Sequence, residues 1–244
     1  MRFPPALPHG PVEEVLDGVF FVTGTAAMGG PVAIRFSRNM TIFRRGRSLT
    51  IVNSMRLNDV GLEELDKLGK VENVVRIAGF HGLDDAFYRD RYGAKIWAVE
   101  GQTYAKGFTN TNVRPQDGYL QPDVWMTPDS ELPIDDARLI VLRGLVPEGM
   151  IYVDRYDGLL VSGDCLQNYG VTDRYFSTIG ALVMRFMGFI KPHNVGPGWL
   201  KGAKPNRDDI RALLDLEFDH VLPVHGVRVI GGAKEKYRPA IERL

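Results

Sequence analysis

The chain of 244 residues has 30 basic and 30 acidic side chains, a formal net charge of zero, and 44% hydrophobic residues. This composition excludes an intrinsically disordered chain and lacks the basic excess typical of nucleic-acid-binding proteins. The single cysteine, Cys165, excludes an internal disulfide and fits a reducing compartment, and no apolar run is long enough to span a membrane. The start of the chain has three prolines and no continuous apolar segment, so we expect no secretory signal and a cytoplasmic location.

The first half of the chain predicts strands, followed by alternating helices and strands. Two runs rich in β-forming residues flank a short polar link that contains Gly46, which is the pattern of a hairpin. Asp59 and Asp84 are candidate caps for the two helices. The expected elements are strands at 19–22, 40–43 and 49–52, a helix at 61–68, a strand at 71–77, a helix at 84–92 and a strand at 95–99.

The second half repeats this order. Strands are expected at 137–142, 150–153 and 159–161, and the last two flank a turn over 154–158 that ends in Gly158. A helix at 208–216, an extended segment at 220–222 and a helix at 234–244 follow. Two similar halves, each with a sheet beside helices, predict a sandwich of two sheets with helices outside.

Polar side chains gather in three loops that follow predicted strands. His81 lies in the loop 78–85, Asp164 in the loop 162–165, and His225 in the loop 223–226. Binding and catalytic residues are often found on loops that a rigid scaffold positions. These three loops are therefore the candidate site.

At these loops the chain resembles the metallo-β-lactamase superfamily. The segment 212–226 is similar to its C-terminal signature, a helix and strand that end in a Pro-x-His-Gly metal-binding loop. Residues 159–165 resemble its strand that ends in Ser/Thr-Gly-Asp, and residues 93–98 resemble the strand after its first metal-binding motif. The resemblance implies an α/β (α+β) fold, a four-layer αββα sandwich of two mixed sheets. It implies one domain over 1–244, with a divergent helical insertion at about 169–205.

The superfamily's two metals are held by a His-x-His-x-Asp-His motif, a further His, a bridging Asp and a last His. This chain has five histidines, and two alignments of the first motif are open. If His81 is the first His of the motif, Leu83 and Ala86 stand in place of its second and third histidines, and Asp85 is the motif's Asp. If His81 is the second His, Gly79, Leu83 and Asp84 stand at the remaining positions. We prefer the first alignment because it puts an Asp where the motif has one.

The ligands that the resemblance leaves are His81, Asp85, Asp164 and His225, because Leu145 stands near the position of the further His. We therefore expect at most one ion, of Zn, Fe or Mn, with no bound metal as the other outcome. The predicted function is a hydrolase that uses a metal-bound water on an unknown small molecule, with Asp85 and Asp164 as candidate catalytic residues. The alternative is a non-catalytic, metal-free relative that binds a small molecule or serves in assembly.

Residues 175–190 depart from the superfamily pattern. Their apolar side chains recur at helical spacing and predict a helix, which Gly180 and Gly188 weaken. We considered packing on the sandwich, a homodimer contact, a lid over the site and a shallow membrane contact. Because an interfacial helix usually carries several cations and this stretch has only Arg185, packing or a homodimer contact is the favoured interpretation.

Overall fold

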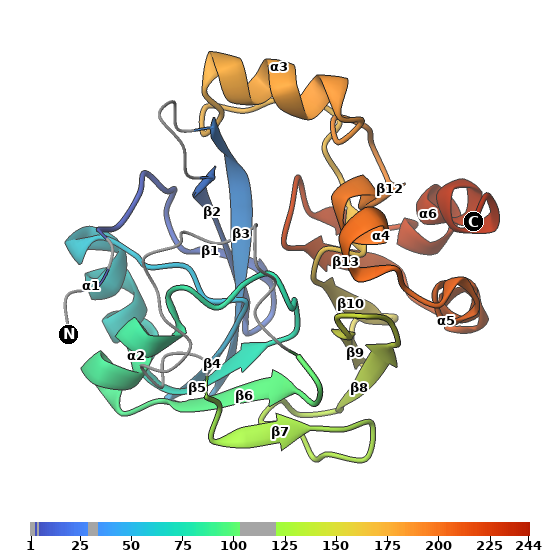
Figure 1. Cartoon of the computed structure of the whole chain (residues 1–244). Helices are drawn as coiled ribbons and strands as arrows, with labels where there is room; N and C mark the ends of the chain where they lie inside the picture. The colour runs from blue at the N-terminus through green and yellow to red at the C-terminus, as the bar shows by residue number, and fades with distance from the viewer. Residues whose placement is uncertain (1–2, 4, 29–33, 103–120) are drawn as a thin grey trace.

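Two sheets pack face to face in the computed structural model, which describes residues 3, 5–28, 34–102 and 121–244 (Figure 1). The first sheet has seven strands in sequential order: β1 Glu13–Leu16, β2 Val19–Met28, β3 Ile34–Arg45, β4 Ser48–Val52, β5 Lys70–Arg76, β6 Lys95–Val99 and β7 Val124–Met126. The second has five strands in the order β14-β13-β10-β9-β8: β8 Ala137–Leu142, β9 Glu148–Val153, β10 Leu159–Ser162, β13 His220–Pro223 and β14 Val229–Ile230.

Both sheets are mixed, as the resemblance implied. The predicted hairpin around Gly46 is the antiparallel pair β3–β4, whereas β4, β5, β6 and β7 run parallel to one another. In the second sheet β10 is antiparallel to β9 and parallel to β13. Because β10 and β13 are parallel neighbours, the loops that follow them leave the sheet at the same edge.

Three apolar cores fill the spaces between the layers of the fold. The central core lies between the sheets and includes Val75 from the first and Val161 and Leu222 from the second. A second core packs the other face of the first sheet against α1 Asp59–Leu68 and α2 Asp85–Tyr92. A third covers the outer face of the second sheet with α4 Pro197–Ala203, α5 Arg207–Arg211 and α6 Ala233–Glu242. The predicted four-layer αββα sandwich is confirmed.

The helix starts differ in detail from the prediction. Asn58, not Asp59, caps α1, since its side-chain oxygen accepts a hydrogen bond of 2.9 Å from the backbone N–H of Gly61. Asp84 precedes α2 but makes no capping hydrogen bond, because its carboxylate is paired with Arg38. The predicted helix at 208–216 is the short α5 continued by a 3₁₀ turn, Ala212–Asp215.

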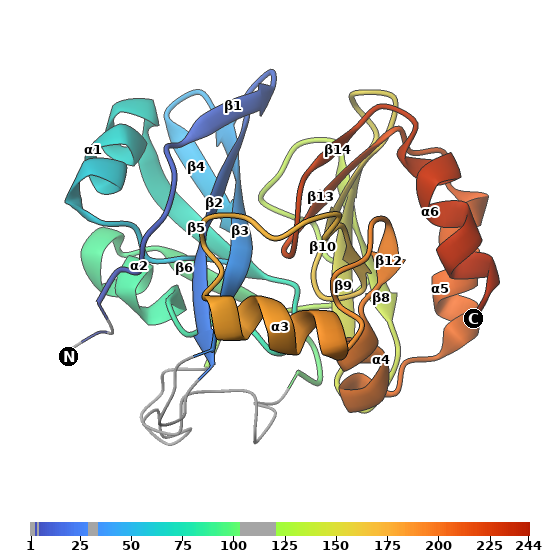
Figure 2. The ribbon, with the colours of Figure 1, turned by 90° about the horizontal axis from the view of Figure 1, so that it is seen from above.

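The segment predicted as divergent contains a helix, α3 Thr178–Phe186, and the short strand β12 Asn194–Val195, which pairs with β11 Leu166–Gln167. Figure 2 shows α3 crossing from the β3 side of the molecule to the side of the second sheet. Neither α3 nor any other helix among the described residues has the length and apolar character needed to cross a bilayer.

Candidate metal centre

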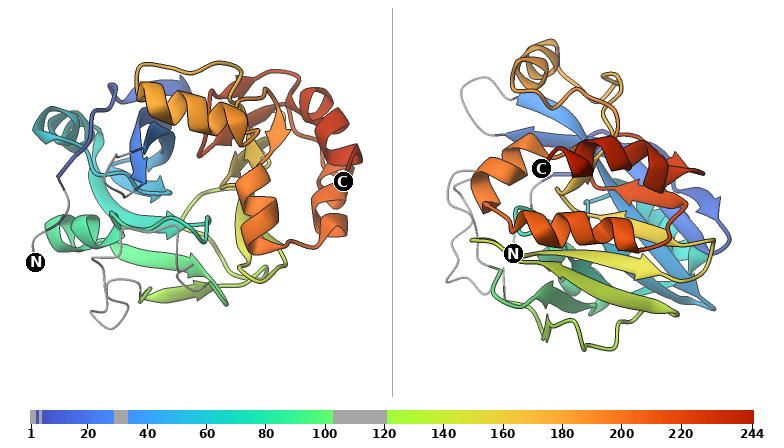
Figure 3. Two further views of the ribbon diagram at one scale, coloured as in Figure 1. Left: turned by 45° about the horizontal axis from the view of Figure 1, so that its top comes forward. Right: turned by 90° about the vertical axis from the view of Figure 1, so that its right-hand side faces the viewer.

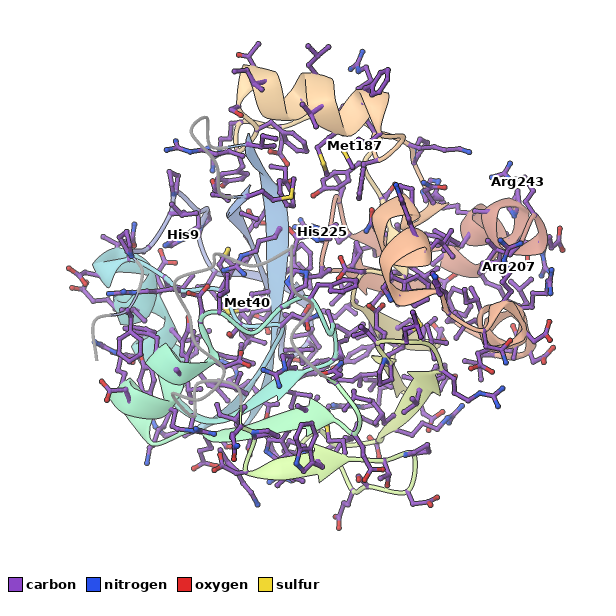
Figure 4. The ribbon with its side chains drawn as sticks, viewed as in Figure 1. His9, Met40, Met187, Arg207, His225 and Arg243 are labelled. Atoms are coloured by element: carbon purple, nitrogen blue, oxygen red, sulfur yellow. The ribbon has the colours of Figure 1, made fainter. Side chains whose placement is uncertain are left out.

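His81, Asp164 and His225 meet at the edge where three loops leave the two sheets. Asp164 lies two residues after β10, and His225 lies two residues after β13. Since Ser162 is paired with Pro223 in these parallel strands, the two loops start side by side. His81 follows β5 of the facing sheet by five residues. Figure 4 shows His225 between the two halves of the molecule, below α3.

The carboxylate of Asp164 lies between the two imidazoles. Its Oδ1 is 3.1 Å from Nε2 of His225, and its Oδ2 is 3.5 Å from Nε2 of His81. One ligand atom from each of the three residues lies within 4.8 Å of the others. In tetrahedral zinc sites, bonds of 2.0–2.2 Å place neighbouring ligand atoms roughly 3.3–3.6 Å apart. The two contacts of Asp164, at 3.1 and 3.5 Å, are close to this range, so small shifts of the three side chains would let them share one ion.

The His225 ring is held in place by polar contacts at Nδ1, the ring nitrogen that does not face Asp164. Its Nδ1 lies 3.1 Å from the backbone carbonyl of Ser37 and 3.1 Å from the hydroxyl of Tyr169, which itself donates to that carbonyl. A carbonyl only accepts, so Nδ1 carries the proton and donates. The lone pair of a neutral His225 is then on Nε2, which faces Asp164. Hydrogen bonding at the distal ring nitrogen fixes metal-binding histidines in the same way.

The loop that carries His225 is tied to the first sheet. The side-chain amide of Asn39, on β3, donates to the carbonyls of Pro223 at 2.8 Å and Gly226 at 2.6 Å. Gly226 has a φ of +91°, and a Cβ there would lie 2.2 Å from the carbonyl of Asn168, so this close turn requires glycine. His225 is thus held between the two sheets by contacts at both ends of its loop.

The charges in the site suit cation binding. Burial by itself would raise the pKa of Asp164, but the two adjacent imidazoles outweigh burial and hold that pKa well below its ordinary value. Burial lowers the pKa of His81 in spite of the opposing attraction of Asp164. An ionised carboxylate and a neutral imidazole are the forms that coordinate metals. In addition, Oδ2 of Asp164 is buried and accepts no hydrogen bond, so it is an acceptor for which an ion would provide a partner.

The structure does not bring Asp85 into this group. Its Oδ2 lies 3.3 Å from a guanidinium nitrogen of Arg76, and its Oδ1 accepts a 2.6 Å hydrogen bond from the hydroxyl of Ser54. The group of three potential ligands in the described part of the chain does not include it. The first alignment was preferred because it puts Asp85 at a ligand position. The geometry does not support that placement.

Leu145 and Asp84, at two of the expected ligand positions, do not take part in the centre. Leu145, near the position of the further His, has 68% of its surface exposed and so lies outside the buried centre. Asp84, the last position in the second alignment, is paired with Arg38 and not with the three ligands. The centre therefore consists of three groups from three loops.

Glu148 also belongs to the site, although no motif of the sequence predicts it there. It begins β9 and is fully buried, and its Oε1 accepts a 2.6 Å hydrogen bond from the backbone N–H of Cys165, next to Asp164. A Cβ at Gly163 would lie 2.9 Å from its carboxyl carbon, so Glu148 packs directly against the turn that carries Asp164. The available signal was an acidic residue at the start of an otherwise apolar strand.

We expect Glu148→Gln to stabilise the metal-free protein at alkaline pH. Burial, reinforced by the charge of Asp164, raises the pKa of Glu148 well above its ordinary value of 4.5. Above pH 4.5 the folded chain then binds one more proton than the unfolded chain, so wild-type stability falls as pH rises. Glutamine keeps the acceptor for Cys165 and needs no proton.

Urea denaturation of the chelated protein at pH 5.5 and pH 8 measures this effect. The gain in unfolding free energy is expected to be on the order of 1 kcal/mol or more at pH 8 and smaller at pH 5.5. Glu63→Gln, at an exposed position of α1, is the matched control and should show no such difference. A Glu148→Gln variant less stable than wild type at pH 8 would contradict the prediction.

No family model and no curated protein matches this chain. Solved structures do match it over almost its whole length. The metallo-β-lactamase DIM-1 gives a TM-score of 0.64 at 13% identity, covering 98% of each chain. FIM-1 from Pseudomonas aeruginosa, a metallo-β-lactamase in its mono-zinc form, gives 0.62 at 12% identity, covering 98% of this chain and 97% of its own. A metallo-β-lactamase from Pontibacter korlensis gives 0.58 at 13% identity, with coverages of 96% and 99%.

Proposed function

We propose that this chain, which has the metallo-β-lactamase fold, is a metal-dependent hydrolase with a single ion held by His81, Asp164 and His225. The observation that carries the proposal is that the buried carboxylate of Asp164 lies between the imidazoles of His81 and His225, with its Oδ2 left without a hydrogen-bond partner. When bound, such an ion polarises the scissile bond and makes a bound water nucleophilic at neutral pH.

The residues of the chain have distinct parts in this proposal. Asp164 supplies the negative charge, while Ser37 and Tyr169 fix the ring of His225 so that its Nε2 faces the ion. Three protein ligands leave a further coordination position for water or substrate, as in catalytic zinc sites, and a mixed N/O set also suits Fe and Mn. Asp85 stays outside the proposed centre because it is paired with Arg76.

The closed surroundings of the centre favour a small substrate. The side chains of His81, Asp164 and His225 are only 8–10% exposed. A substrate must therefore bring a narrow reacting group to the ion, as a small ester, amide or lactam can. We propose an unknown small molecule of this kind.

A combined metal and activity assay tests the proposal. Untagged protein, purified without chelators and then loaded separately with Zn²⁺, Fe²⁺ or Mn²⁺, is analysed by inductively coupled plasma mass spectrometry. We expect about one equivalent of one ion, lost in His225→Ala and kept in His193→Ala, whose half-buried ring lies outside the group. A panel of small esters, amides and lactams is expected to contain a substrate whose hydrolysis depends on that ion.

The alternative is a metal-free protein that binds a small molecule or serves in assembly. It is favoured by the 3.1 Å separation of His225 Nε2 and Asp164 Oδ1, because a protonated His225 would close this contact without an ion. Its signature is a wild-type protein that takes up no metal and gains no thermal stability from any of the three ions. That result would overturn the hydrolase proposal.

A further inference from the structure

The helix α3 has one buried face and one exposed apolar face. Gly180 and Met184 are buried, and Gly180 lies so close to β3 that a Cβ would be 2.1 Å from the carbonyl of Arg35. On the other side Ile179, Leu182 and Phe186 are 49%, 69% and 92% exposed. Positions three and four residues apart lie on one face of a helix. These three side chains, called here the α3 ridge, therefore form a continuous apolar stripe.

The α3 ridge projects from the molecule. Figure 3 (right) shows α3 beyond the edges of the two sheets and apart from the outer helices α4, α5 and α6. A convex ridge of this kind does not offer a groove to a partner. It suits insertion into a soft apolar medium, as the apolar faces of interfacial helices do.

Three exposed cations lie on α3 or next to its ends. The stretch 174–207, which lies between Asp173 and Asp208, contains six basic residues and no acidic residue, although the whole chain is neutral. Arg185 lies on α3, and Lys191 follows this helix in the chain. Arg35 of β3 lies at the N-terminal end of α3, where the backbone N–H of Arg35 donates to the hydroxyl of Ser177. All three side chains are exposed, and the ion pairs among the described residues include none of them. Arg185 is the single cation of the segment 175–190, and the fold places a second cation, Arg35 of β3, at the end of the same helix.

This charge argues against a contact between two copies of the chain. A two-fold dimer places the same patch on both sides of the interface, so both sides would carry these cations and neither would supply acidic partners from the stretch 174–207. A partner that is both apolar and anionic pairs with the ridge and with its cations. We propose that α3 docks on the surface of a membrane containing anionic phospholipids, with the α3 ridge among the acyl chains and Arg35, Arg185 and Lys191 at the headgroups.

Co-sedimentation with vesicles tests this proposal on the whole chain. We expect binding to vesicles of phosphatidylcholine with 30% phosphatidylserine, and at least about tenfold weaker binding to phosphatidylcholine alone, since each cation near an anionic surface contributes about fivefold. The double variant Leu182→Ser/Phe186→Ser is expected to lose at least about tenfold in partition coefficient, because it removes two large apolar side chains from the ridge. Val60→Ser, at a 64% exposed position of α1, is the matched control and should bind as wild type does.

The cations are tested separately from the ridge. Arg185→Gln/Lys191→Gln is expected to weaken binding to the anionic vesicles about 25-fold at low salt and to leave binding to neutral vesicles unchanged. Lys67→Gln, an exposed basic position in the last turn of α1, is the control for loss of charge alone.

Two outcomes would overturn the proposal. One is a wild-type protein that does not sediment with anionic vesicles at low salt. The other is a wild-type dimer, detected by light scattering, that Leu182→Ser/Phe186→Ser converts to a monomer while vesicle binding is absent. The second result would assign the ridge to contact between copies of the chain. Neither outcome depends on metal at His81, Asp164 and His225, so failure here is separable from failure of the proposed hydrolase function.

Discussion

Asp164→Asn is expected to weaken metal binding by more than about 100-fold, beyond the 10- to 100-fold loss typical when a residue that only supports a metal ligand is replaced. Asp164 is the one anionic group among the three converging ligands, and its carboxylate lies between both imidazoles. Asparagine has the same shape but no charge to balance a divalent ion. Equilibrium dialysis followed by metal analysis measures the loss, and hydrolysis of any identified substrate should fall with it.

The matched control for this variant is Asp154→Asn. Asp154 is exposed and is paired with Arg138 at 3.3 Å, remote in the chain from the three loops. Its replacement removes the same charge from the protein and should leave metal content unchanged. If Asp164→Asn retains one tightly bound equivalent, Asp164 is not a ligand and the proposed centre is wrong.

Asp85→Ala is expected to lower the free energy of unfolding by about 3 kcal/mol, the lower end of the range for breaking a buried ion pair. The change removes a buried carboxylate from Arg76 and the acceptor of the Ser54 hydroxyl. Burial raises the pKa of Asp85 despite Arg76, so desolvation offsets part of the attraction between the two groups. Urea denaturation of the metal-free protein at pH 7 measures the loss.

Metal content distinguishes this structural role from the catalytic role expected from the sequence. Asp85→Asn keeps an acceptor for Ser54 and should cost less stability than Asp85→Ala, and both variants should retain the ion. The neighbouring Asp90→Ala, at an exposed position of α2, controls for loss of a carboxylate from this helix. Loss of the ion in Asp85→Asn with unchanged stability would return Asp85 to the ligand set.

Local patterns predicted the elements of the sandwich well. The strands β6 and β8 have the predicted bounds, and the hairpins β3–β4 and β9–β10 form as expected. Their signals are local, since a run of β-forming residues and a turn around Gly46 or Gly158 depend on neighbouring residues only. The strand β7 had no such signal. It has three residues and is a strand because it pairs with β6.

The candidate site was predictable as a set of loops but not as a set of ligands. His81, Asp164 and His225 could be named because each follows a predicted strand in a loop with glycine. Glu148 and Tyr169 could not be placed there, since they reach the site from β9 and from the segment after β11. Their contacts join residues 17 and 56 positions apart along the chain.

The sequence by itself determined the order of strands and helices, the layered fold and the three loops at its edge, because periodicity and turn residues act over a few positions. Only the tertiary structure decided that Asp85 is paired with Arg76 while Asp164 joins the two histidines. It also decided that Leu182 and Phe186 are exposed on α3, where helical spacing allowed a packed face. The direction of a side chain depends on strand register and on the rotation of a helix against its sheet, and both are set by packing between segments distant in the chain.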